Sequence, residues 1–158
     1  MRGSSPRMAG ENMKRVSNIC FAGHWNPATA IDRVVLDAGD RQRRRAVLTG
    51  EKGTTFLLDF DRPVTLRDGD GLVLDDGSVV QVVGQPEQFV EISTRNKVDL
   101  VRLAWHIGNR HTELQIVGSA LRIRRDHVLE DMLRGQGAAL TPLDASFEPV
   151  TIDGGHGT

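Results

Sequence analysis

The chain has 158 residues and a formal net charge of −1, with five Phe, two Trp, no Tyr and a single Cys. At roughly 100 to 200 residues per domain this length allows one domain or two small ones, whose cores must consist mainly of Val, Leu and Ile. A single cysteine excludes an internal disulfide framework, and every uncharged apolar stretch is shorter than the 18 or so residues that cross a bilayer. We therefore expect a cytoplasmic protein without a membrane segment. Because 20 basic residues balance 21 acidic ones, we expect no general attraction to nucleic acid.

Composition divides the first half of the chain into a leader and a β-rich domain. Residues 1–30 mix Gly, Ser, Pro and Asn without helical or strand periodicity, which predicts a flexible leader. Between 31 and 85, short Val- and Leu-rich runs alternate with turns that contain Gly and Asp, and these predict a small all-β, peptide-binding-like domain. The expected strands cover 34–36, 46–49, 54–60, 71–74 and 79–83.

The pattern changes at Pro86, which is poorly suited to the interior of a central strand and therefore marks a domain boundary. Asn96 and Asp126 are suitable N-caps for two helices, and Gly108 and Gly135 are suitable residues to end them. The expected elements are a strand over 88–94, a helix over 96–108, strands over 114–117 and 121–123, a helix over 126–135 and a strand between 139 and 148.

This order, β-α-β-β-α-β over 86–149, is typical of a ferredoxin-like domain. The whole chain is therefore expected to be α+β: a small all-β N-terminal domain, a ferredoxin-like C-terminal domain and a mobile tail over 150–158. On the first helix Val98, Val101 and Trp105 share one face, with further apolar residues beside them.

The topology predicts that three of the five histidines meet at one edge of the sheet. In a right-handed β-α-β-β-α-β arrangement, the end of the first helix, the start of the second helix and the exit of the last strand share that edge. His111, His127 and His156 follow those three points. Other interpretations remain open, because His127 also suits the polar first turn of a helix and His156 lies at a terminus. His106 is expected to be a structural helix residue.

The motifs of common enzyme and zinc sites do not occur. The sequence contains no CxxC, HxH or HExxH pattern, no phosphate-binding glycine loop and no GxSxG elbow, so we expect no enzyme and no closed zinc site within one chain. A twofold dimer, in contrast, places two imidazoles on its axis and forms an open, exchangeable site for Ni²⁺, Cu²⁺ or Zn²⁺. Arg41, Arg43, Arg44 and Arg45 are candidates for contact with an acidic partner, although a solvated face is the simpler interpretation.

Two strings resemble the urease nickel metallochaperone family, UreE. They are Trp105-His-Ile-Gly-Asn-Arg-His111, followed by Leu114-Gln-Ile116, and Asp126-His-Val-Leu-Glu-Asp-Met-Leu133. The resemblance covers about 31–149. It implies a homodimer in which His111 and its symmetry mate bind Ni²⁺, with His156 as a further ligand from the tail. In some members the position of His127 belongs to an alternating histidine pair, but here Arg125 occupies the other place.

The resemblance also implies partners. These are the urease GTPase accessory protein, UreG, and the apo-urease assembly complex, to which Ni²⁺ is delivered. The main alternative is a metal-independent adaptor or assembly chaperone whose β domain holds an extended peptide. A ferredoxin-like RNA-binding module is a third possibility, but the strands expected over 114–117 and 121–123 lack the aromatic residues that stack on bases.

Overall fold

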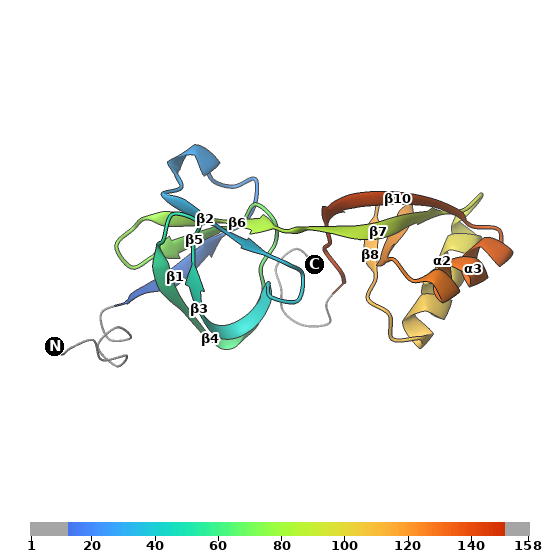
Figure 1. Cartoon of the computed structure of the whole chain (residues 1–158), viewed down its shortest axis with the longest axis horizontal. Coiled ribbons are helices and arrows are strands. Elements are labelled where there is room, and N and C mark those ends of the chain that lie inside the picture. Colours follow the sequence, from blue (N-terminus) through green and yellow to red (C-terminus); the bar gives the residue numbers. More distant parts are fainter. Residues whose placement is uncertain (1–12, 151–158) are drawn as a thin grey trace. The chain divides into compact units, whose positions relative to one another are not determined.

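The computed structural model describes residues 13–150, which form two compact units. The first unit extends to Gly84 and contains only strands and one short 3₁₀ helix, whereas the second begins at Gln85 and contains two helices and four strands (Figure 1). The expected α+β class, with a β-rich N-terminal part and a mixed C-terminal part, is confirmed. None of the described helices is long and apolar enough to cross a membrane.

The first unit is built on one six-stranded sheet with the order β2-β6-β5-β1-β4-β3. Strand β1 pairs parallel with β4 and antiparallel with β5, and β3 forms an edge. Its core is made of aliphatic residues with one aromatic ring, Phe56. The strands are β1 (Lys14–Cys20), β2 (Asp32–Leu36), β3 (Gln42–Thr49), β4 (Thr55–Thr65), β5 (Gly71–Leu74) and β6 (Val79–Gly84), and the 3₁₀ helix η1 covers Pro27–Thr29.

Part of the expected leader is integral to this sheet, so the prediction of a leader over 1–30 is wrong for residues 14–30. Strand β1 lies between β4 and β5. Trp25 donates a hydrogen bond from Nε1 to the carbonyl oxygen of Gly69 over 3.0 Å, and its ring packs so closely on Gly71 that a Cβ there would lie 2.7 Å from it. Only Val16 of β1 is fully buried. The strand therefore shows little apolar alternation and depends on partners about 40 to 60 residues away.

A buried carboxylate organises the turn between β3 and β4. Asp32 accepts hydrogen bonds from the backbone N–H groups of Lys52 and Thr54 and from that of Arg33. Burial raises the pKa of Asp32, but these hydrogen bonds together outweigh it and hold the pKa at about 2. Gly50 packs directly against the same carboxylate, because a Cβ there would lie 2.4 Å from Oδ2.

The second unit has a four-stranded sheet with the order β10-β7-β9-β8, and both helices lie on one face of it (Figure 1). Every pairing is antiparallel, so β7 and β8, which flank β9, run in the same direction. This is the ferredoxin-like arrangement. The elements are β7 (Pro86–Ser93), α2 (Lys97–Asn109), β8 (Gln115–Val117), β9 (Ala120–Arg124), α3 (His127–Gly135) and β10 (Ala139–Ser146).

Helix α2 buries one side and exposes an apolar stripe on another. Leu103 and Ile107 are buried in the core together with Leu129 and Leu133 of α3. Three apolar side chains of α2 remain 64–68% exposed: Val98, Val101 and Trp105. These residues, spaced i, i+3 and i+7, share one face, as the sequence predicts, but that face is turned away from the core.

Candidate metal site

Helix α2 ends in a Schellman motif whose left-handed residue is His111. The C-cap is Arg110. The N–H of His111 donates to the carbonyl of Gly108 over 3.0 Å, and the N–H of Thr112 donates to that of Ile107 over 3.4 Å, which is the hydrogen-bond pattern of this motif. The left-handed position is therefore His111, three residues beyond Gly108, the residue expected to end the helix.

His111 adopts φ = 57° and is the one residue other than glycine with a positive φ in the described part of the chain. Helix α3 ends with the same two hydrogen bonds, from Gly137 to Arg134 and from Ala138 to Leu133, but there the left-handed residue is Gly137, with φ = 89°. A side chain at this position costs free energy that glycine avoids. Left-handed residues other than glycine occur often at functional sites, which makes His111 a candidate.

Three chain segments meet at the sheet edge where His111 lies. The register pairs Pro86 at the start of β7 with Ser146 at the end of β10, and it pairs Phe89, three positions further along β7, with Arg124 at the end of β9. Helix α2 therefore returns to this edge, and α3 starts from it. Arg110 places a guanidinium nitrogen 3.3 Å from the sulfur of Met132, so the end of α2 contacts α3.

His127 occupies the first turn of α3 with its side chain 89% exposed. Its Nε2 lies 3.5 Å from Oδ2 of Asp131, one turn along the helix. The N-cap is Asp126, as expected, and its carboxylate accepts from the N–H of Leu129 over 3.0 Å. An exposed imidazole beside a carboxylate can serve as a surface ligand pair, but the described residues contain no group of three or more potential metal ligands.

Arg125 stabilises the start of α3. It makes two hydrogen bonds of 3.0 Å to the carboxylate of Glu130, which is 3% exposed and also accepts from the N–H of Asp126 over 2.8 Å. Hydrogen bonding from Arg125 lowers the pKa of Glu130, while burial raises it, and the net effect is a lowered pKa. Arg125, which occupies the other place of the histidine pair that the resemblance suggests, is thus part of a structural ion pair.

The segment that leads to the C-terminal tail is attached beside the loop after His111. The N–H of Val150 donates to the carbonyl of Leu114 over 2.7 Å, and the N–H of Glu148 donates to the side-chain oxygen of Gln115 over 3.0 Å. His156 itself lies outside the described residues. His106 makes an edge contact with the ring of Trp105, with 5.1 Å between ring centroids, as suits a structural helix residue.

The arginine run divides into different roles. Arg41 is 1% exposed, and its guanidinium donates to the carbonyls of Leu36 and Leu66 over 3.3 Å, so the expectation that it contacts a partner is wrong. A sequence pattern gives no signal that one arginine of a basic run turns into the protein. Arg43 pairs with Asp40 of its own turn over 2.8 Å. Arg44 and Arg45 are exposed, and they remain candidates.

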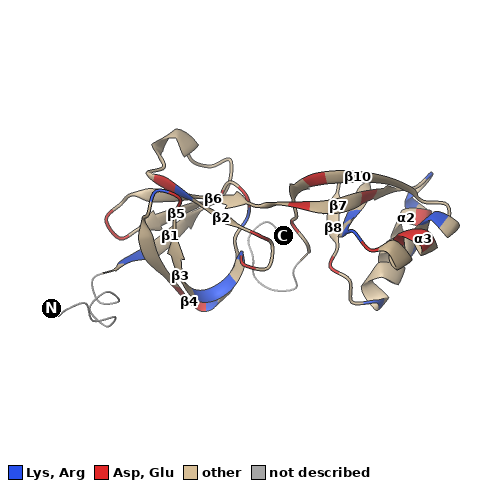
Figure 2. Ribbon diagram, in the orientation of Figure 1, with Lys and Arg blue, Asp and Glu red and all other residues tan. Residues whose placement is uncertain are grey.

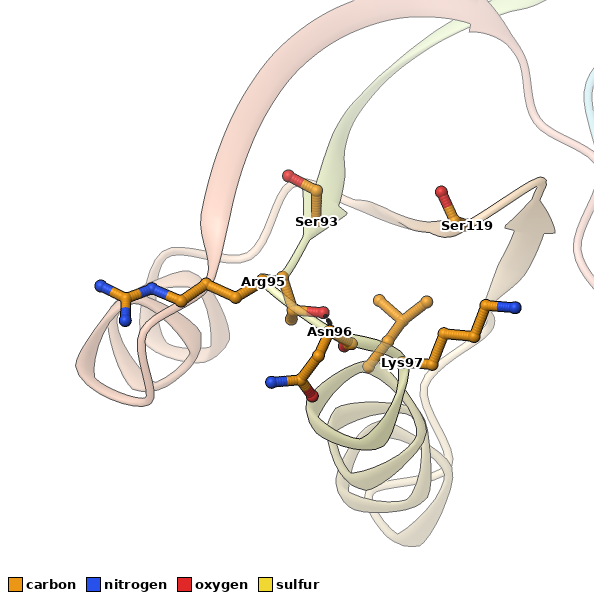
Figure 3. A pocket seen from close by; sticks show the side chains of 7 residues that line it. Ser93, Arg95, Asn96, Lys97 and Ser119 are labelled. Atoms are coloured by element: carbon orange, nitrogen blue, oxygen red, sulfur yellow. Dashed lines mark hydrogen bonds between the residues drawn. The ribbon is translucent and has the colours of Figure 1, made fainter.

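A pocket of about 180 Å³ lies at the opposite end of α2, around its N-terminus (Figure 3). The side chains of Arg95 and Lys97 extend in opposite directions there, and Asn96 caps the helix through Asp99. The pocket therefore lies a full helix length from His111, and the carboxamide oxygen of Asn96, one of its lining residues, is already used for capping.

Comparison with known proteins decides the family. A model of the N-terminal domain of the UreE urease accessory protein matches residues 14–85, and a model of its C-terminal domain matches residues 87–158. The chain belongs to the UreE family. Both family models describe their domains as parts of a urease accessory protein.

Three curated relatives, each named urease accessory protein UreE, illustrate the similarity. The chain is 51% identical to that of Rhodopseudomonas palustris strain HaA2 over 137 residues, covering 87% of this chain and 63% of the relative. It is 47% identical to that of Bradyrhizobium sp. strain ORS 278, with 87% and 65% covered, and 41% identical to that of Rhizobium rhizogenes strain K84, with 91% and 88% covered. The chain thus spans less than two thirds of the length of several UreE relatives that it matches.

Proposed function

We propose that this chain is a cytoplasmic nickel metallochaperone that delivers Ni²⁺ to apo-urease, and that His111 is its main ligand. The observation that carries the proposal is the left-handed backbone of His111 at the end of α2, a place where the same chain uses glycine at the end of α3. The protein tolerates a strained residue there, exposed to solvent, and its imidazole is a good ligand for Ni²⁺. Membership of the UreE family supports apo-urease as the recipient of the ion.

A homodimer would supply the second imidazole. The exposed stripe of Val98, Val101 and Trp105 runs along α2 towards His111, and exposed apolar side chains in a row are typical of an interface. In a twofold dimer each stripe packs on its own copy, so two His111 side chains approach each other when the axis passes near the end of the helix. Trp105→Asp should therefore give a monomer in sedimentation analysis and weaken nickel binding, whereas a dimer that survives this change would contradict the interface.

We propose that the tail contributes His156 to the site. His156 lies six positions after Val150, whose backbone N–H is bound to Leu114, and a chain segment of that length reaches at most about 20 Å. His127 at the start of α3 is a further candidate, with Asp131 beside it. We expect these residues to complete or supplement a pair of His111 ligands. Such an open site releases its ion readily, as delivery requires, and it also admits Zn²⁺ or Cu²⁺ because imidazole binds all three ions.

Calorimetric nickel titration tests the ligand assignments. His111→Ala should abolish tight binding, His106→Ala should leave it intact as a matched control on the same helix, and deletion of 151–158 should reduce affinity or stoichiometry. Binding should weaken in acid, because imidazole binds a metal ion only when it is deprotonated. Unchanged tight binding by His111→Ala would refute the site, and an unchanged titration of the truncated chain would remove His156 from it.

Delivery requires a recipient. We propose that UreG, and through it the apo-urease assembly complex, receives the ion when it docks over the exposed edge that holds His111. Transfer can be measured by mixing the nickel-loaded chain with UreG and following the metal content of each protein after separation. Nickel that stays on the chain in the presence of UreG and apo-urease would contradict the proposal.

The open sheet face of the second unit does not favour the RNA-binding alternative. Arg122 and Arg124 of β9 are held in ion pairs of 2.9 Å with Glu91 and Glu87 of β7, and Phe89 between them is fully buried. Base stacking requires an accessible aromatic ring on this face.

The metal-independent adaptor is tested by equilibrium dialysis against Ni²⁺, because an adaptor should retain none.

A further inference from the structure

The β1-β4-β3 part of the first sheet has an outer face that combines arginines with an exposed apolar residue. In the register, Arg45 lies opposite Asp59, and Leu57 lies opposite both Val47 and Arg15. Phe56 and Leu58, on either side of Leu57, belong to the hydrophobic core. Because successive side chains of a strand alternate between faces, the set opposite Leu57 and Asp59 must point away from the core.

The ion pairs on this face do not balance. Arg15 Nη1 lies 3.6 Å and Arg45 Nη1 lies 3.4 Å from the same atom, Oδ2 of Asp59. Two positive charges thus share one carboxylate, through long contacts, and the two arginine side chains are 56% and 61% exposed. Each guanidinium carries five N–H donors, of which one such contact uses only a fraction. A second carboxylate is the group that would complete this arrangement.

The neighbouring strand, β3, adds an exposed apolar side chain to this face and forms an edge of the sheet. The register between β3 and β4 shifts between Arg43 and Arg45, where the extra residues belong to β4. Figure 2 shows the arginine run of β3 as a blue stretch of the β-rich unit. Val47, two positions after Arg45 and on the same face, is 58% exposed. Strand β3 forms an edge of the sheet, the place at which an extended segment can lie alongside a protein.

We propose that this basic face, formed by Arg15, Arg45 and Val47, docks an extended acidic segment of a partner protein. Its carboxylates bind the guanidinium groups, and an apolar residue two positions along contacts Val47. A nucleic acid fits less well, because Asp59 lies between the two arginines and no aromatic residue is among the three residues that form the face. The proposal does not depend on nickel, since these residues belong to the first unit and His111 to the second.

Fluorescence anisotropy with a short labelled peptide of alternating Glu and Val tests the proposal on the full chain. The double variant Arg15→Gln, Arg45→Gln should weaken peptide binding by about fivefold or more, in keeping with the strength of exposed ion pairs. Asp59→Asn should strengthen binding, because it removes the internal competitor for both guanidinium groups. The matched control is Arg33→Gln, which breaks a one-to-one pair of 3.0 Å with Glu51 and should leave the affinity unchanged.

The remaining outcomes decide against the proposal. Equal peptide affinity in the double variant and in the Arg33→Gln control would overturn it, as would the absence of peptide binding to the natural chain at low salt. A peptide of alternating Lys and Val that binds equally well would show that charge is irrelevant. Tighter binding of an oligouridylate, lost in the double variant, would assign the face to nucleic acid. Nickel titration of the same variants should be unchanged, which separates this test from that of His111.

Discussion

Replacing His111 by glycine should stabilise the metal-free protein while it removes the proposed nickel ligand. The left-handed conformation costs a residue with a Cβ roughly 1–2 kcal/mol, whereas the greater freedom of glycine in the unfolded chain costs roughly 0.5–1 kcal/mol. His111 is exposed, so little packing is lost with the imidazole. The expected net gain is about 0.5–1 kcal/mol in the free energy of unfolding, or roughly 2–8 °C in the melting temperature of a domain of this size.

Helix α3 provides the matched control within the same domain. Gly137 holds the corresponding position of the same motif, so Gly137→Ala should lose about the free energy that His111→Gly gains. His111→Ala removes the ligand but keeps a Cβ, and it should leave the stability almost unchanged. The measurement is urea denaturation of all three variants in the presence of EDTA, followed by nickel titration. If His111→Gly proves no more stable than His111→Ala, the strain that we assign to this residue does not exist.

Three further changes test other parts of the structure. Gly50→Ala should destabilise the β-rich unit by roughly 2 kcal/mol or more in thermal unfolding, because its Cβ would overlap the Asp32 carboxylate. Gly39→Ala, whose Cβ would make one contact of 3.5 Å, should have a mild effect, and equal effects of the two changes would contradict this packing. The lowered pKa of Asp32 stabilises the folded state above pH 3.8, and about 2 kcal/mol of this stability should be lost as the pH falls from 3.8 towards 2. Asp32→Asn should lack this pH dependence, so equal acid unfolding profiles of the natural chain and the variant would refute the prediction. Glu130→Gln should lower the free energy of unfolding of the second unit by roughly 1–3 kcal/mol in denaturant, because it removes the charge of the buried carboxylate that accepts hydrogen bonds from Arg125. An unchanged unfolding midpoint would show that the ion pair contributes nothing.

Local signals predicted the helices well because their determinants lie within a few residues. Asn96 and Asp126 cap α2 and α3 through N–H groups three positions ahead, and such contacts need no distant partner. The order of elements then led to the ferredoxin-like topology, since the handedness of β-α-β connections leaves few choices. The convergence of the segments around His111 and His127 at one sheet edge follows from the same rule.

The tertiary structure decided the features that depend on distant residues. Strand β1 has one buried side chain and becomes a strand only by pairing with β4 and β5. Arg41 turns inward because the carbonyls of Leu36 and Leu66 accept its hydrogen bonds.

By itself, the sequence determined the family, the two-domain order and the identity of His111 as the candidate ligand, because motifs, caps and turns are local patterns. Only the fold showed that α2 continues to Asn109 and that His111, rather than a glycine, takes the left-handed position after it. It also showed that Val98, Val101 and Trp105 are exposed while Leu103 and Ile107 are buried. Helical periodicity defines a face, but which face meets the sheet depends on the direction from which the strands approach it.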